Sequence, residues 1–179
     1  ANSIELIGGE NIVVKNCQLG AQPTGITCKV QEVNKLSFIN NQVYPDGREN
    51  LVLDACNNCV IEGNNFKSYY NGILVLNGND NTVNKNIFWL TGAVQNQLLD
   101  HGDDFGIINV KGNNNMVASN SLSCEWAYAG AVTVNAVQGT GNVFKNCFVD
   151  NLESYRVFLV NAQTEVSNCV SSDKVSIVE

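Results

Sequence analysis

A short phrase that recurs along the chain constrains the fold more than any other feature of this sequence. The phrase reads apolar, two residues, asparagine, one residue, apolar. Its copies span residues 38–43, 61–66, 83–88, 117–122 and 143–148, with a weaker copy at 165–170 and a copy at 14–19 that has Cys17 in place of asparagine. Successive asparagines, from Asn41 to Asn168, lie 23, 22, 34, 26 and 22 residues apart. A period in the twenties is typical of solenoids, whose repeats bury their apolar faces only by stacking.

The composition of each repeat favours strands over helices. Each copy is short and rich in β-branched residues, and Gly or Asn clusters flank it. In most units a second candidate strand follows, at residues 25–30, 50–54, 72–76, 106–110, 131–135 and 157–160. Two or three short strands per unit make one coil of a parallel β-helix, and the leucine pattern of leucine-rich repeats is missing. We therefore predict an all-β, right-handed, single-stranded parallel β-helix of about seven to eight coils of 22–26 residues, as a single domain over residues 1–179.

The recurrent asparagine has a structural explanation within such a coil. Asparagine tolerates left-handed backbone angles at a tight turn. Stacked side-chain amides can also hydrogen-bond to the same amide one coil away. We therefore interpret these asparagines as structural residues and not as ligand-binding ones.

Composition excludes some classes of partner. The chain has 179 residues, 44% of them hydrophobic, with two prolines and a net charge of −7. This content can fill one continuous core, and the negative charge argues against nucleic acid and against anionic membrane surfaces as partners. No apolar run is long enough to cross a bilayer.

Seven cysteines are an odd number, so they cannot all pair within one chain. Cys17, Cys147 and Cys169 lie in or beside the asparagine turn, and we interpret them as reduced core residues. The Cys56–Cys59 pair suggests a metal, but zinc needs four ligands and the chain has one histidine. We expect neither a metal nor another cofactor. We expect an extracellular rather than a cytoplasmic location, although unpaired cysteines leave the compartment open.

The coil pattern is interrupted once, at residues 89–104. The stretch contains the only histidine of the chain, and its candidate substrate-binding residues are Asp100, His101, Asp103 and Asp104. One interpretation is a solvated acidic loop. The other is a loop that binds substrate or a partner subunit, because function often resides on loops that leave a rigid scaffold. A catalytic His–Asp pair would need a nucleophile that the sequence does not identify.

Alternation along the second strands predicts an outward stripe that is mostly apolar. It would consist of Thr27, Val52, Leu74, Ile108, Thr133 and Phe158. Soluble monomers rarely expose such a stripe, so we expect a partner subunit to cover it. Glu5, on the same outward row of the first strand, is a candidate proton donor near that interface. A solvated strand glutamate is the competing interpretation.

Several segments together resemble the inulin fructotransferases. They are residues 19–26, 40–48, 55–60, 76–78, 103–110 and 112–117. The similarity follows nearly the whole chain in order and at matching spacing, and it covers the C-terminal half or so of a family member.

This resemblance implies a right-handed β-helix that assembles as a homotrimer. Family members release the terminal difructose of inulin as a cyclic difructose anhydride, and relatives hydrolyse that anhydride. Their catalysis is attributed to an Asp and a Glu between subunits. Residues 2–8 match the phrase that holds the Glu, which implies that Glu5 is catalytic. Arg48 lies in a turn like the family's and is a candidate ligand of fructose hydroxyls, although a plain turn arginine is an equal alternative.

The matching Asp would precede Ala1, so we expect a fragment that lacks the N-terminal coils and cap, or a piece that works with a separate N-terminal fragment. The expected function is fructan cleavage to a cyclic difructose anhydride by carboxylate acid–base catalysis, with fructan oligosaccharide or difructose anhydride as ligand. Anhydride hydrolysis is the first alternative. A pectin-type lyase or hydrolase is the second, although no row of Asp with Lys or Arg supports it. A non-catalytic carbohydrate-binding or structural β-helix is the third.

Overall fold

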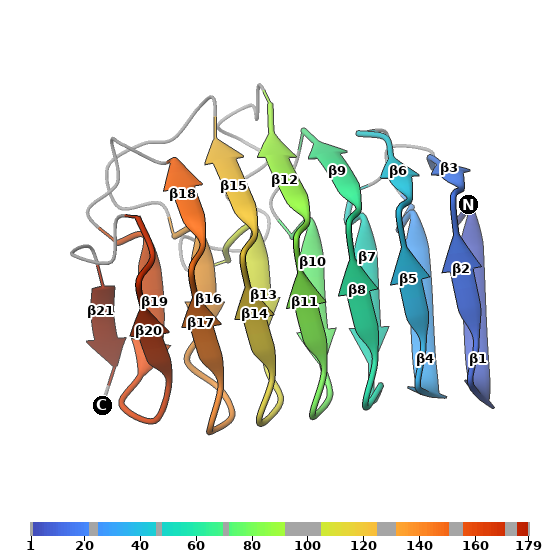
Figure 1. Cartoon of the computed structure of the whole chain (residues 1–179). Coiled ribbons are helices and arrows are strands. Elements are labelled where there is room, and N and C mark those ends of the chain that lie inside the picture. The colour runs from blue at the N-terminus through green and yellow to red at the C-terminus, as the bar shows by residue number, and fades with distance from the viewer. Residues whose placement is uncertain are drawn as a thin grey trace.

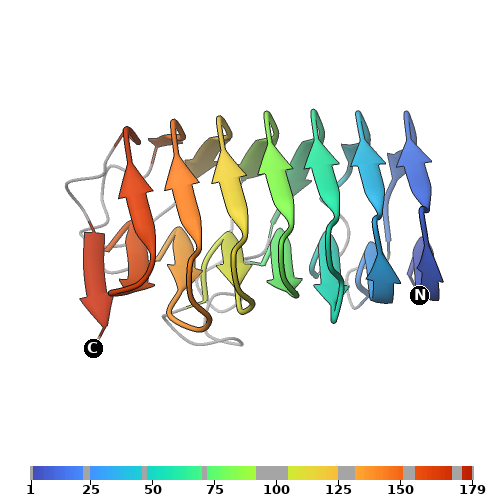
Figure 2. The ribbon, with the colours of Figure 1, turned by 60° about the horizontal axis from the view of Figure 1, so that its bottom comes forward.

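The computed structural model describes residues 2–21, 25–45, 48–69, 72–91, 105–124, 132–150, 156–170 and 175–178. Over these residues the chain is the right-handed parallel β-helix that the repeat predicts, with three parallel sheets that run along the stack (Figures 1 and 2). It makes about six turns between the first and last strands of its seven-stranded sheet, slightly fewer than the seven to eight coils that we expected.

Sheet A contains β1 (Ile4–Glu10), β4 (Cys28–Asn34), β7 (Leu51–Asp54), β10 (Leu74–Asn77), β13 (Ile108–Val110), β16 (Val134–Ala136), β19 (Phe158–Asn161) and β21 (Val175–Val178). Sheet B contains β2 (Val13–Lys15), β5 (Ser37–Ile39), β8 (Val60–Glu62), β11 (Thr82–Asn84), β14 (Met116–Ala118), β17 (Val143–Lys145) and β20 (Glu165–Ser167). Sheet C contains β3 (Gln18–Leu19), β6 (Gln42–Val43), β9 (Asn65–Ser68), β12 (Ile87–Leu90), β15 (Ser121–Cys124) and β18 (Phe148–Asp150).

A ladder of buried asparagines joins the coils at the corner between sheets B and C, as the repeat predicts. Asn41 Nδ2 donates to Asn64 Oδ1 at 3.0 Å, Asn64 donates to Asn86 at 2.9 Å, and Asn86 donates to Asn120 at 3.0 Å. Each of these oxygens also accepts the backbone N–H of the preceding asparagine. The ladder thus satisfies polar groups that the tight corner would otherwise bury without partners.

In the last two coils the predicted position of the ladder residue was wrong by one. Strand pairing aligns Phe144 with Val117 and Val166 with Phe144. The ladder position is therefore held by the next residues, the buried Cys147 and Cys169. Asn146 (φ 55°) and Asn168 (φ 51°) occupy the left-handed position just before it, where asparagine is well tolerated.

The predicted outward stripe on sheet A was also wrong, apart from the half-buried Val52. Five of its six members are instead buried, at 0–1% exposure: Thr27, Leu74, Ile108, Thr133 and Phe158. The strand register explains the difference for three of them, because Leu74, Ile108 and Phe158 pair into the same inward row as Leu51 and Val134. Thr27 and Thr133 lie at the corner directly before β4 and β16, ahead of the alternating part of each strand. The argument for a partner subunit that covers this stripe therefore has no support from the described residues.

Close backbone stacking at the corner between sheets A and B requires glycine. A Cβ on Gly78 would lie 1.8 Å from Cys56 O, and a Cβ on Gly112 would lie 1.7 Å from Gly78 O. We expect Gly78→Ala to lower the free energy of unfolding by about 3 kcal/mol, because rigid backbone must move. Gly8→Ala is the control, since Gly8 has φ +68° but open space around it, and should cost about 1–2 kcal/mol. Urea denaturation measures the free energy of unfolding of both variants. If the two lose equal stability, the lack of space for a Cβ is not what requires glycine at position 78.

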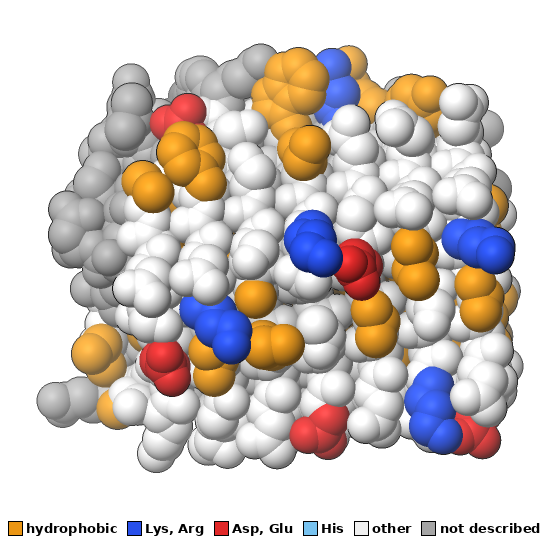
Figure 3. Space-filling view, in the orientation of Figure 1, with side chains coloured by type: hydrophobic (Ala, Val, Ile, Leu, Met, Phe, Trp, Pro, Cys, Tyr) orange, Lys and Arg blue, Asp and Glu red, His pale blue; other side chains and the backbone are white. Residues whose placement is uncertain are grey.

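Charged side chains are dispersed over the face formed by sheets B and C (Figure 3). Several form exposed ion pairs between neighbouring coils, such as Lys85–Glu62 at 3.1 Å and Lys35–Glu10 at 2.8 Å. Such exposed pairs contribute little to stability. Among the described residues there is no helix of a length and apolar character suited to crossing a membrane.

Candidate functional site

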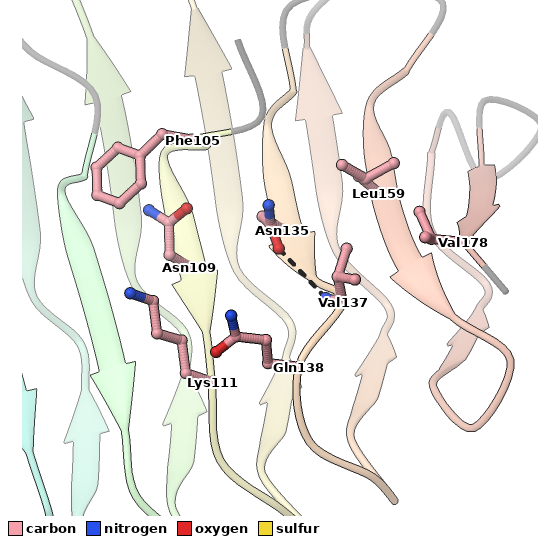
Figure 4. Close-up of a pocket in the computed structure, with 8 residues that line it drawn as sticks. All are labelled: Phe105, Asn109, Lys111, Asn135, Val137, Gln138, Leu159 and Val178. Atoms are coloured by element: carbon pink, nitrogen blue, oxygen red, sulfur yellow. Dashed lines mark hydrogen bonds between the residues drawn. The ribbon is translucent and has the colours of Figure 1, made fainter. Parts of the chain in front are cut away.

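A groove of about 320 Å³ lies on the outer face of sheet A, towards the C-terminal end of the stack (Figure 4). Its lining comes from β13, β16, β19 and β21 and the segments beside them: Phe105, Asn109, Lys111, Asn135, Val137, Gln138, Leu159 and Val178. Figure 4 shows the polar side chains in the middle, with Phe105 at one end and Leu159 and Val178 at the other. An apolar wall with a few convergent polar groups is the usual character of a ligand-binding pocket.

The position of Phe105 is fixed by its neighbours. Asn109 is 2% exposed, its Oδ1 accepts the N–H of Gly106 at 2.9 Å, and its Nδ2 donates to Gly106 O at 2.8 Å. Both hydrogen bonds hold the residue that follows Phe105. Gly72, with φ +79°, leaves the space that the Phe105 ring fills, because a Cβ there would lie 2.5 Å from the ring. Asn109 and Gly72 therefore position the aromatic end of the groove.

A half-buried carboxylate that the sequence analysis did not single out lies beside Phe105. Glu49 Cγ is 3.4 Å from the same Cβ position at Gly72 that the Phe105 ring approaches. The Glu49 side chain is 14% exposed, and its Oε1 lies 3.8 Å from Arg48 Nε. Arg48, a predicted substrate-binding residue, is thus placed with Glu49 near this end of the groove. In the sequence, the only indication of a role for Glu49 was that it directly follows Arg48.

The opposite wall is held by asparagines. Asn161 Nδ2 donates to Val137 O at 2.9 Å and to Gly139 O at 2.6 Å. Asn135 Oδ1 accepts the N–H of Val137 at 3.2 Å, the bond drawn in Figure 4. These bonds anchor the segment that carries the exposed Gln138 over the groove.

The groove is suited to binding rather than to proton transfer. Among the described residues that line it, Lys111 is the one charged residue, and the rest are amides, an aromatic ring and aliphatic side chains. Amides and an ammonium group can bond to hydroxyls, and the flat ring can pack against an apolar face of a ligand. Since this described lining includes no carboxylate, we look for acid–base chemistry in the residues beside it.

Glu5 lies on the same outer face but outside the groove. Strand register aligns Glu5 with Lys29, Val52, Val75 and Asn109 in one row across sheet A. Neighbouring strands are about 4.8 Å apart, so β1 is roughly 19 Å from β13. Glu5 Oε1 lies 3.5 Å from Lys29 Nζ, with the Glu5 side chain 47% exposed. Glu5 is thus paired with Lys29, whereas Arg48 lies beside Glu49. Asp100, His101, Asp103 and Asp104 lie outside the described residues.

Several solved structures that are similar to this chain share its fold. DFA-IIIase from Arthrobacter chlorophenolicus A6 without its lid matches with a TM-score of 0.80 and 22% identity over 96% of this chain and 45% of that one. The same protein in complex with GF2 matches with a TM-score of 0.78 and 20% identity, over 96% and 46% of the two chains. Alginate lyase from Paenibacillus sp. str. FPU-7 matches with a TM-score of 0.63 and 11% identity over 89% and 59%. The chain thus spans less than half of the DFA-IIIase chains, and these identities establish the fold alone.

The sequence itself matches a family model over residues 1–163, that of the periplasmic copper-binding protein NosD. The chain belongs to the NosD family. No curated protein matches it significantly in sequence. Within its described ranges, this NosD-family chain has no group of three or more His, Cys, Asp or Glu residues that could hold a metal ion. These residues therefore do not fit the copper of the family's description, and we assign copper no role at them.

Proposed function

We propose that this chain is a carbohydrate-active β-helix, or part of one, that binds fructan across the outer face of sheet A and helps to cleave it to a cyclic difructose anhydride. The groove of Figure 4 is the observation that carries the proposal. Its aromatic end, its amides and Lys111 provide the two kinds of contact that a sugar chain needs, which are a flat apolar surface and hydroxyl-binding groups.

The choice of fructan rests on the resemblance in sequence to the inulin fructotransferases. The similar DFA-IIIase structures were solved with GF2 and with DFA-III bound. These two compounds are therefore the first ligands to test. Hydrolysis of the anhydride is the alternative reaction, and the complexes with DFA-III favour testing it beside synthesis.

In the proposed mechanism, Glu5 is one of two carboxylates that move protons. Cleavage of a fructosyl bond needs a proton on the departing oxygen and stabilisation of an oxocarbenium-like centre. In anhydride formation a hydroxyl of the neighbouring fructose attacks instead of water, and a carboxylate takes its proton. An oligosaccharide of several units that lies along this row of sheet A would reach from Asn109 in the groove to Glu5, roughly 19 Å away.

Assembly and location follow from the same proposal. The resemblance to inulin fructotransferases leads us to propose a homotrimer. A polymeric substrate and the periplasmic description of the NosD family favour a location outside the cytoplasm.

Binding of GF2 to groove variants tests the proposal. Phe105→Ala and Lys111→Ala should each weaken binding about tenfold in calorimetric titration, since each removes about 1–1.5 kcal/mol of contact energy. The matched controls lie on other sheets: Phe148→Ala on β18, where the side chain is 52% exposed, and Lys145→Ala on β17. Unchanged affinity in the groove variants, or an equal loss in the controls, would contradict a sugar site in the groove.

A further inference from the structure

The asparagine ladder ends in two cysteines. Cys147 follows Asn120 in the ladder position, and Cys169 follows Cys147 one coil later, so the two lie opposite each other in neighbouring coils. Both are buried, at 3% and 6% exposure, and both are free thiols in this structure. Cys147 N–H donates to Cys169 Sγ at 3.4 Å, in place of the amide oxygen that accepts this bond in the middle coils.

We propose that Cys147 and Cys169 are an oxidisable pair that closes to a disulfide between the last two coils of sheet B. Neighbouring parallel strands place opposite Cα atoms about 4.8 Å apart, which lies within the range of about 4.4–6.8 Å that disulfides need. The Cys169 sulfur already lies 3.4 Å from the backbone nitrogen of Cys147. Closure therefore needs side-chain rotation and little backbone movement.

Cys169 is the residue that reacts first. The hydrogen bond from the Cys147 thiol lowers the pKa of Cys169 to about 7, and thiolates are the reactive form. In addition, β20, which precedes Cys169, pairs on one side only among the described strands of sheet B, with β17. The Cys169 thiolate attacks the sulfur of a small-molecule disulfide, such as glutathione disulfide, and releases one thiol. Cys147 then attacks the mixed disulfide and releases the second, so two protein thiols are oxidised as one external disulfide is reduced to two thiols.

The chain contains a matched pair for comparison. Interaction with Cys59 lowers the pKa of Cys56 to about 7 as well, but these two cysteines are 0% and 1% exposed. Both lie just before β8, which lies between β5 and β11 and is covered on both sides. The same chemistry should therefore leave Cys56 and Cys59 reduced in the folded protein.

The test is incubation of the folded chain with glutathione disulfide, followed by alkylation under denaturing conditions and peptide mass mapping. We expect two of the seven thiols to resist alkylation, with one link that maps to Cys147–Cys169. The oxidised protein should melt roughly 5 °C or more above the reduced one, and dithiothreitol should reverse the shift. Cys169→Ser should abolish the link and Cys56→Ser should leave it intact.

Three results would overturn the proposal. They are a link that maps to other cysteines, a stable glutathione adduct on Cys169 without closure, and seven alkylated thiols. Peptide mass mapping of the chain without substitutions distinguishes these three results, even if a variant fails to fold. The outcome is independent of the proposed fructan activity, because neither cysteine lines the groove or lies beside Glu5.

Discussion

Glu5→Gln is expected to lower turnover of inulin or difructose anhydride by a factor of about 10² to 10⁴, the usual contribution of a general acid or base. Glutamine has the same shape but cannot exchange a proton at neutral pH. The fold should not change, because Glu5 is exposed and its 3.5 Å pair with Lys29 is a surface ion pair. Product analysis by chromatography, with the native melting temperature as a control, measures the two effects separately.

Two further glutamates make this prediction specific. Glu10→Gln removes the same charge from the same strand, where Glu10 is paired with Lys35 at 2.8 Å, and should retain turnover. Glu49→Gln tests the half-buried carboxylate beside Phe105. Full activity in Glu5→Gln together with loss in Glu49→Gln would remove Glu5 from the mechanism and assign its role to Glu49.

Asn86→Ala is expected to destabilise the protein by at least about 3 kcal/mol, because it interrupts the ladder at its centre. Asn86 Nδ2 donates to Asn120 Oδ1 at 3.0 Å and to Ile61 O at 2.9 Å. Its Oδ1 accepts from the backbone and side chain of Asn64, both at 2.9 Å. Alanine removes these four hydrogen bonds, although Asn120 Oδ1 keeps the backbone N–H of residue 86. Each buried group that is left without a partner, such as the Asn64 N–H, costs about 1–3 kcal/mol.

The control for Asn86→Ala is Asn65→Ala, at a half-buried position of sheet C outside the ladder. Its effect should stay within about 0.5 kcal/mol, the usual range for surface substitutions. Urea denaturation followed by circular dichroism compares the two variants. If they lose equal stability, the ladder is not what holds the coils together at this corner.

The asparagine period was sufficient to predict the fold because the same physical requirement recurs in every coil. A corner that buries its backbone must supply a hydrogen-bonding side chain in every coil, and Asn41, Asn64, Asn86 and Asn120 do so. The prediction was wrong by one residue where cysteine replaces asparagine. At Val143-Phe144, two adjacent apolar residues fit the spacing equally well, and only strand pairing decides between them.

The candidate site was less accessible to sequence reasoning. The register of several sheet A strands was misjudged by one residue, so buried residues such as Phe158, which pairs with Val134, were expected outside. The groove draws Phe105 and Lys111 from the coil of β13, Gln138 from the coil of β16 and Leu159 from that of β19. Polar residues at such outward positions look like ordinary solvated ones. Only the stacking of the coils places them around one space.

A crystal structure of the protein soaked with GF2 tests the central claim most directly. We expect a sugar ring against Phe105, with hydroxyls bonded to Lys111 and Gln138. Another aromatic surface is on sheet C, where Lys67 Nζ lies 4.1 Å from the centroid of the Trp89 ring. Sugar bound there, or an empty groove at saturating GF2, would contradict the proposed sugar site.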